Sequence, residues 1–179
     1  MRVLILDRDG VINYDSPAYI KSPEEWRAIP GSLEAIARFN RAGFRVMIAS
    51  NQSGLARGML DARALDAIHA KLGAELASLG GRVEAILYCP HAPDDACDCR
   101  KPKPGLFQQI ARLPDVKLAT ALAVGDSLRD LQAAASAGVE AVLVRTGNGE
   151  KTLKAGGVPA EVRVFDDLAA VADYFVGTT

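Results

Sequence analysis

The chain has 179 residues, of which 49% are hydrophobic and 24% are charged, and its formal net charge at pH 7 is −1. This composition is typical of a globular protein, and the interspersed acids and bases argue against a basic face for nucleic acid. Apolar runs are shorter than the roughly 18–20 residues that cross a bilayer, and the N-terminus lacks the features of a signal peptide. We therefore expect a cytoplasmic protein with no membrane or nucleic-acid partner, acting as a monomer.

Short apolar runs alternate with helical patterns along the chain. The first run, residues 3–6, precedes a turn-rich segment over residues 11–30, and Ser32 is expected to cap a helix that ends near Ala42. Further strands are predicted at residues 44–50, 85–88, 120–124, 141–144 and 162–165, and further helices after Asp61, after Pro104, over 128–137 and after Asp167. This alternation predicts an α/β fold, a doubly wound parallel sheet with helices on both faces, in which residues 1–179 form one domain.

Three carboxylates follow predicted strands. Asp7 and Asp9 come directly after the first strand, and Asp126 follows the fourth. Ligands of such sheets bind beyond the carboxyl ends of the strands, so these side chains should meet at one edge. Without a counter-charge they would repel one another or take up protons, whereas Mg²⁺ suits a site of few carboxylates, waters and phosphate oxygens. The sequence therefore predicts a magnesium site formed by Asp7, Asp9 and Asp126.

All three cysteines lie in one short segment, CPHAPDDACDC, at residues 89–99. An odd number of cysteines packed so closely is not a disulfide framework, and metal binding is favoured in a reducing compartment. Three thiolates and one imidazole make a complete tetrahedral zinc set with no open position for water. We therefore expect a structural Zn²⁺ bound by Cys89, His91, Cys97 and Cys99, although a loop that merely carries thiols is the alternative.

Four segments in order along the chain carry a family resemblance. They are DRDGVIN, SNQSG, RKPKPG and GDSLRD, which begin at residues 7, 50, 100 and 125. Each stands at the end of a predicted strand or the start of a predicted helix. Together they resemble the four signature motifs of the haloacid dehalogenase-like phosphohydrolases, over about residues 3–145, and imply that family's fold and chemistry.

The resemblance implies a role for each matching residue. Asp7 would be the nucleophile that attacks phosphorus and forms an aspartyl-phosphate, and Asp9 would be the general acid and then the general base. The backbone carbonyl of Asp9 would also reach the metal. Ser50, with the backbone of Asn51, would hold the phosphate, and Lys101 would neutralise charge on the transferred group.

The last motif leaves two positions open. Asp126 would hold Mg²⁺, whereas Asp130 would either ligate it through water or pair with Lys101. Ser127 stands where some relatives place a lysine, so the resemblance does not assign it a part in substrate recognition.

The substrate should be recognised without a separate cap domain, because neither usual insertion point has enough residues for one. Specificity would then come from the short loops at residues 14–20 and 55–58 and from the zinc loop. Arg57 and Arg100 are the candidates for binding a second anionic or polyhydroxyl part of the substrate, and either could instead be a solvated surface side chain.

A narrower resemblance concerns the substrate. The DRDG start, NQSG and the zinc loop leading into CRKP are similar to the D-glycero-D-manno-heptose 1,7-bisphosphate 7-phosphatases and to the histidinol-phosphate phosphatases. SNQSGLARG and KPKPG favour the heptose enzymes, which implies removal of the 7-phosphate in the synthesis of nucleotide-activated heptose for lipopolysaccharide. Histidinol-phosphate hydrolysis and a catalytically inactive, zinc-stabilised binding module are the alternatives, and a nucleic-acid end phosphatase is conceivable for a site without a cap.

Overall fold

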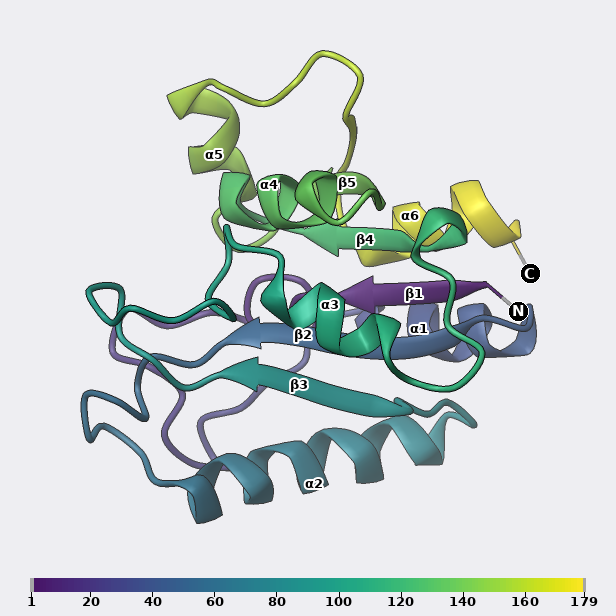
Figure 1. Cartoon of the computed structure of the whole chain (residues 1–179). Coiled ribbons are helices and arrows are strands. Elements are labelled where there is room, and N and C mark those ends of the chain that lie inside the picture. Colours follow the sequence, from purple (N-terminus) through teal and green to yellow (C-terminus); the bar gives the residue numbers. More distant parts are fainter. Residues whose placement is uncertain (1, 179) are drawn as a thin grey trace.

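The computed structural model describes residues 2–178 and places six parallel strands in one sheet (Figure 1). The strand order is β3-β2-β1-β4-β5-β6, so β1 lies in the middle between β2 and β4. The strands are β1 (Val3–Leu6), β2 (Arg45–Asn51), β3 (Ala85–Cys89), β4 (Leu122–Gly125), β5 (Glu140–Val144) and β6 (Arg163–Phe165). All arrows in Figure 1 point the same way, so the loops that follow the strands gather at one edge of the sheet.

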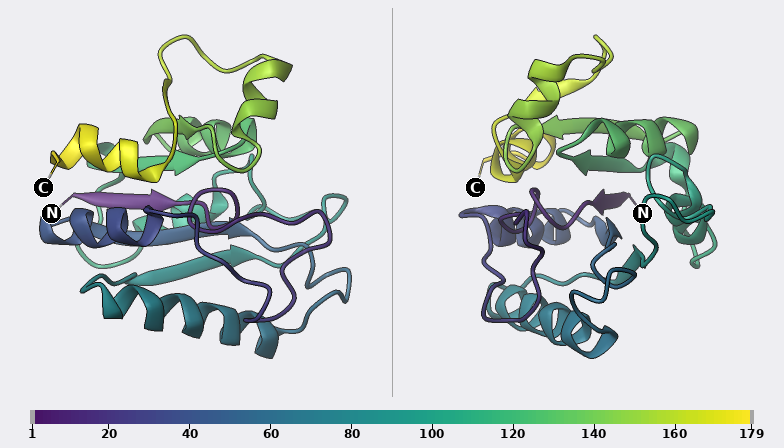
Figure 2. Two further views of the ribbon diagram at one scale, coloured as in Figure 1. Left: turned by 180° about the vertical axis from the view of Figure 1, so that it is seen from behind. Right: turned by 90° about the vertical axis from the view of Figure 1, so that its left-hand side faces the viewer.

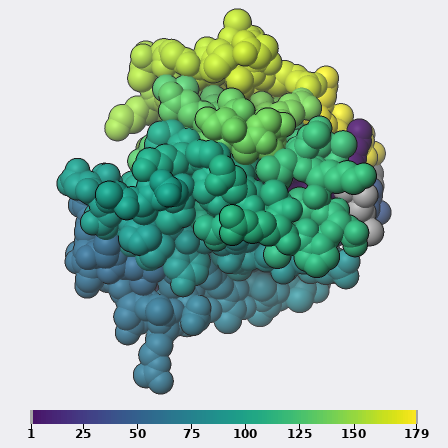
Figure 3. Space-filling model, in the orientation of Figure 1, coloured from purple at the N-terminus to yellow at the C-terminus, as the bar shows by residue number. Residues whose placement is uncertain are grey.

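Helices cover both faces of the sheet, which confirms the predicted doubly wound architecture. One apolar core lies under α1 (Ser32–Arg41), α2 (Ala62–Ser78) and α6 (Leu168–Val176), and a second lies under α3 (Gly105–Ala111) and α4 (Leu128–Ser136). All four residues of β1 are buried, as expected for a strand covered on both sides. Figure 2 shows the two layers of helices from behind and from the edge, and in Figure 3 later segments hide almost all of the N-terminal strand.

The helix caps partly agree with the sequence-based predictions. The Asp61 and Asp167 carboxylates each accept a hydrogen bond of 2.8 Å from a backbone N–H of the helix that follows, which confirms both caps. The cap assigned to Ser32 is wrong. Gly31 occupies that position with φ 84°, and the Ser32 hydroxyl donates to the carbonyl of Val11 instead.

Two other local predictions need correction. Residues 118–120 form a short 3₁₀ turn, in which the Ala121 N–H bonds the carbonyl of Leu118, so β4 begins two residues later than predicted. Helix α5 (Gly149–Ala155) was not predicted, because its seven residues carry no apolar stripe and Gly149 alone is buried among those described.

The direction of the chain crossovers reverses at β1. The chain passes from β1 to β2 and β3 on one side, then returns to β4 on the other, and this is where parallel sheets place their ligands. Among residues 2–178, the segment between β1 and α1 contains isolated bridges but no helix or strand, so no folded cap is inserted there. None of the described helices is both long and apolar enough to span a membrane.

Candidate active site

A cleft of about 250 Å³ opens at the carboxyl ends of β1, β2 and β4. It brings together most of the residues selected from the sequence, including Asp7, Asp9, Asn51, Arg100, Lys101 and Asp126. Asp7 is held at the end of β1 by a bond of 3.0 Å from its N–H to the carbonyl of Val124 on β4. The pairing of neighbouring parallel strands thus fixes how Asp7 and Asp126 approach each other.

Lys101 is the buried cation of the cleft, with only 3% of its side chain exposed. Its Nζ lies 3.0 Å from Asp7 Oδ1 and 2.6 Å from Asp130 Oδ1, and it donates to the carbonyl of Ala49. Burial alone would lower the pKa of Lys101, but the Asp130 and Asp7 carboxylates raise it above its ordinary value. Lys101 therefore stays charged at neutral pH.

The single positive charge of Lys101 does not balance the negative charges of Asp7, Asp126 and Asp130. Burial is the main cause that raises the pKa of Asp7 to about 8, and the carboxylates of Asp130 and Asp126 raise it further against the effect of Lys101. Burial, followed by the charge of Asp130, raises the pKa of Asp126 to about 7. Asp7 would therefore be mostly protonated and Asp126 partly protonated at neutral pH unless another positive charge entered the cleft.

The geometry fits a divalent cation at this point. Carboxylate oxygens of Asp7, Asp126 and Asp130 all lie within 4.8 Å of one another. Asp130 is already engaged, because its Oδ1 pairs with Lys101 while its Oδ2 accepts from the hydroxyl of Ser127 at 2.6 Å. Of the two roles left open for Asp130, the structure therefore shows pairing with Lys101. Among residues 2–178, Asp7 and Asp126 each keep one carboxylate oxygen without a hydrogen bond, so these two could hold a cation.

Asp9 lies in a cradle of hydrogen-bond donors that was not predicted. The Arg8 guanidinium bonds both carboxylate oxygens at 3.0 and 3.1 Å, and the amides of Asn13 and Gln52 donate at 2.9 and 2.8 Å. Arg8 is only 1% exposed and also lies 3.3 Å from the ring of His69. The sequence held one signal for this cradle, which is Arg8 in DRDG directly after a predicted buried strand. An arginine that is buried requires an acidic partner.

His69 is a partly buried histidine that lies behind this cradle. Burial, together with the nearby charge of Arg8, lowers the pKa of His69 to about 4. Its ring is therefore neutral at physiological pH and can accept a hydrogen bond from the Arg8 guanidinium.

Ser50 and Asn51 lie at the end of β2, and their side chains make different contacts. The Ser50 hydroxyl is buried and accepts from the amide of Gln52 at 2.8 Å. The Asn51 side chain binds the backbone of Lys101 twice, donating to its carbonyl at 3.1 Å and accepting from its N–H at 3.0 Å. Asn51 therefore joins the β2 end to the segment that supplies the buried ammonium group.

Positive side chains gather at the mouth of the cleft. Arg100 and Arg129 line both the cleft and an adjoining hollow of about 350 Å³, to which Lys103 also contributes. Burial and the positive charges of Arg129 and Arg57 lower the pKa of Arg100. Arg57 is exposed and lies outside the cleft lining, and Arg129 was not selected from the sequence. These guanidinium groups would attract a second anion near the first.

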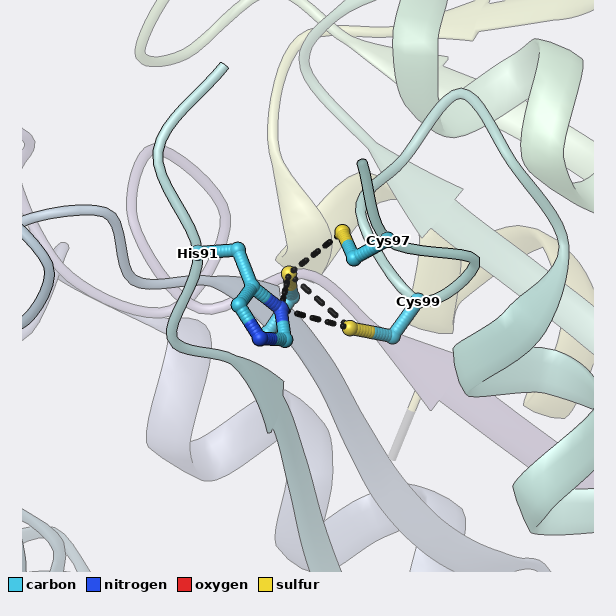
Figure 4. Close-up of side chains that lie close together, drawn as sticks. His91, Cys97 and Cys99 are labelled. Atoms are coloured by element: carbon cyan, nitrogen blue, oxygen red, sulfur yellow. Dashed lines mark hydrogen bonds between the residues drawn. The ribbon is translucent and has the colours of Figure 1, made fainter. Parts of the chain in front are cut away.

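The four residues of the predicted zinc set converge in space (Figure 4). The Cys89 sulfur lies 3.7 Å from the Cys97 sulfur and 3.5 Å from His91 Nδ1, and Cys99 approaches both Cys89 and His91 at 3.1 and 3.3 Å. A tetrahedral zinc with Zn–S bonds of about 2.3 Å and a Zn–N bond of about 2.0 Å requires separations of roughly 3.8 and 3.5 Å. Burial raises the pKa of the Cys89 thiol to about 12, so a cation is needed for all three to be thiolates.

Comparison with known proteins places this site in a family. A family model described as HAD-hydrolase-like matches residues 98–171, and one described as polynucleotide kinase 3 phosphatase matches residues 3–134. A D-glycero-beta-D-manno-heptose-1,7-bisphosphate 7-phosphatase from Bordetella bronchiseptica is 61% identical over 173 residues, covering 97% of both chains. Its counterpart in Pseudomonas putida is 56% identical over 96% of this chain and 98% of that protein.

Solved structures agree with the sequence comparison. The crystal structure of the D,D-heptose 1,7-bisphosphate phosphatase from B. bronchiseptica, complexed with magnesium and phosphate, superposes with a TM-score of 0.94 at 60% identity and covers 97% of both chains. That from Burkholderia thailandensis gives a TM-score of 0.78 at 45% identity, covering 99% of this chain and 100% of that one. The chain therefore belongs to the haloacid dehalogenase-like phosphatases and, within them, to the family of D-glycero-beta-D-manno-heptose-1,7-bisphosphate 7-phosphatases.

Proposed function

We propose that the protein is a Mg²⁺-dependent phosphatase that removes the 7-phosphate of D-glycero-beta-D-manno-heptose 1,7-bisphosphate. The observation that carries this proposal is the meeting of Asp7, Lys101 and Asp126 in one cleft. The names of the relatives at 54–61% identity supply the substrate. The reaction would serve the synthesis of nucleotide-activated heptose for lipopolysaccharide.

In the proposed reaction the phosphate ester is hydrolysed in two steps. In the first, an Asp7 oxygen forms a bond to phosphorus as the bond to the sugar oxygen breaks, and Asp9 gives that oxygen its proton. In the second, Asp9 takes a proton from water, the water oxygen attacks phosphorus, and the Asp7 carboxylate is released. Lys101, Ser50 and the Asn51 backbone hold the phosphoryl oxygens throughout, since such transfers depend on positioning and charge stabilisation.

Mg²⁺ is the proposed cofactor of this site. The Asp7 and Asp126 carboxylates and the Asp9 carbonyl would hold it, and it would supply charge neutralisation for the carboxylates and the phosphoryl oxygens. The raised pKa values of Asp7 and Asp126 support this role, because a cation would keep Asp7 ionised and nucleophilic.

The guanidinium groups at the cleft mouth favour a substrate with a second anion. Arg100 and Arg129 line the cleft, whereas Arg57 lies outside its lining, and within residues 2–178 none of the three forms an ion pair. A sugar bisphosphate offers such a second phosphate. Histidinol phosphate instead carries a cationic amine, which these groups would repel, so we assign the histidinol-phosphate reaction second place.

We further propose that residues 89–99 bind a structural Zn²⁺ through Cys89, His91, Cys97 and Cys99. Four donors complete the tetrahedral set, which leaves the ion without a catalytic position. Cys99 is separated from Lys101 by one residue, so the ion would fix the path of the chain into the cleft. Cysteines that remain reduced and bind a metal are typical of the cytoplasm, so we propose a cytoplasmic location. We also propose that residues 1–179 act as one monomeric phosphatase domain.

Steady-state kinetics on three phosphate esters test the substrate. We expect kcat/KM for the heptose 1,7-bisphosphate to exceed that for histidinol phosphate and for a 3′-phosphorylated oligonucleotide by at least about tenfold, because only the first places a second small phosphate near Arg100. A higher kcat/KM for histidinol phosphate would overturn the substrate, and a higher value for the oligonucleotide would assign the cleft to nucleic-acid ends.

The substitution Asp7→Asn tests the nucleophile. We expect turnover to fall by at least roughly a thousand-fold, because an amide does not form the acyl-phosphate. The zinc-loaded variant should nevertheless melt, in buffer without added Mg²⁺, at a temperature no lower than wild type, since the raised pKa of Asp7 makes its charged form unfavourable there without a cation. Retained turnover in the folded variant would refute the assigned nucleophile and with it an aspartyl-phosphate on Asp7.

Metal analysis with the substitution Cys97→Ala tests the zinc. Wild type should retain about one equivalent of zinc after Mg²⁺ is dialysed away, and the variant should melt roughly 5 °C or more lower. Asp94→Ala is the matched control, because Asp94 is exposed in the same loop and is not one of the four proposed donors. Equal melting of Cys97→Ala and the control would contradict a structural role.

A further inference from the structure

The loop after β5, residues 145–148, closes over the carboxylate of Asp126. The Asn148 backbone N–H donates to Asp126 Oδ2 at 2.7 Å, and the Asn148 side-chain amide approaches the same oxygen at 3.2 Å. Within residues 2–178, no hydrogen bond reaches the other oxygen, Oδ1. One oxygen of this candidate metal ligand is thus fixed by the protein, while the other stays available to a cation.

Two glycines make this approach possible. Gly147 has φ 58°, and a Cβ built on it would lie 2.2 Å from Asp126 Oδ2 and 2.4 Å from the Cα of Gly10. A Cβ on Gly10 would lie 2.0 Å from the same oxygen. The Thr146 hydroxyl holds the two segments together by donating to the carbonyl of Gly10 at 2.7 Å. Only bare backbone on both sides of the carboxylate lets the loop reach it.

The Asn148 amide also reaches the wall of the cleft. Its Nδ2 lies 3.2 Å from Asp15 Oδ2, and an amide nitrogen carries two protons, one for each carboxylate. Asp15 belongs to the loop at residues 14–20, which lines the cleft where substrate would enter. Asn148 therefore joins the candidate metal ligand to the segment expected to recognise substrate.

We propose that Asn148 is a positioning residue that orients the Asp126 carboxylate for the divalent cation and anchors the loop at residues 14–20 to it. This inference rests on the proposed function, because it assumes that Asp126 holds the cation. Removal of a residue that orients a metal ligand typically lowers metal affinity or activity by about 10–100-fold.

Binding of Mn²⁺ to the zinc-loaded protein, counted as loss of the free-ion electron paramagnetic resonance signal, tests the proposal without turnover. We expect Asn148→Ala to raise the dissociation constant for Mn²⁺ by about tenfold. Gly147→Ala should raise it at least as much, because the added methyl group displaces the loop from Asp126. Lys151→Ala is the control, since Lys151 is exposed on the neighbouring helix α5, and it should leave the constant within about twofold of wild type.

Hydrogen exchange measured by mass spectrometry supplies the second readout. The peptide covering residues 14–20 should exchange faster in Asn148→Ala than in wild type, because the hydrogen bond to Asp15 is lost. In Lys151→Ala the exchange rate of this peptide should equal that of wild type. An unchanged Mn²⁺ constant in a folded Asn148→Ala protein would overturn the inference while leaving the proposed function intact. Absence of Mn²⁺ binding in wild type would instead contradict the proposed function itself.

Discussion

The cleft is built around an excess of buried negative charge. Asp9 is matched by the buried guanidinium of Arg8, and Lys101 is shared between Asp7 and Asp130. With Asp126, four carboxylates face two cationic side chains, which leaves a formal charge of −2 when all are ionised. Burial makes that charge costly, and this cost is what raises the pKa values of Asp7 and Asp126. A divalent cation would remove the imbalance, so the arrangement that is unfavourable for the carboxylates alone would favour binding of metal and activation of the nucleophile.

The fold assembles this cluster by letting successive strands each supply one part. Asp7 follows β1, Asn51 ends β2, Lys101 comes after the cysteine loop that follows β3, Asp126 follows β4, and Asn148 lies in the loop after β5. Parallel strands carry all these parts to the same edge, and the reversal of crossovers between β1 and β4 leaves the space for a ligand. The cysteine and histidine cluster lies immediately before Lys101, so the loop that supplies the buried ammonium group has its own proposed metal anchor.

The sequence predicted the strands, the sheet architecture and the residues whose chemistry is visible in a motif, such as Asp7, Lys101 and Cys97. Apolar runs and chain order indicate the strands and the sheet, the spacing of the cysteines and the histidine indicates the zinc set, and the family resemblance implies the roles of Asp7 and Lys101. None of these predictions needed knowledge of side-chain contacts. The partners of the site residues were missed, because Arg8, Gln52 and Asn148 acquire their roles only where separate loops meet. Ser32 failed as a predicted cap for a related reason. A tertiary contact, the carbonyl of Val11, takes its hydroxyl, and Gly31 provides the positive φ that begins the helix.

The uncompensated charge of the cleft is tested most directly by counting the protons released when Mg²⁺ binds. Calorimetric titration of the protein with Mg²⁺ in two buffers of different ionisation enthalpy gives this number. With the pKa of Asp7 near 8 and that of Asp126 near 7 in the metal-free protein, both groups are partly protonated at pH 7 and must ionise to bind the cation. The release should therefore be about 1.4 protons at pH 7, roughly 0.9 from Asp7 and roughly 0.5 from Asp126, and should fall toward zero at pH 9. Binding of Mg²⁺ with no proton release at pH 7 would show that the carboxylates are already ionised and would contradict the account.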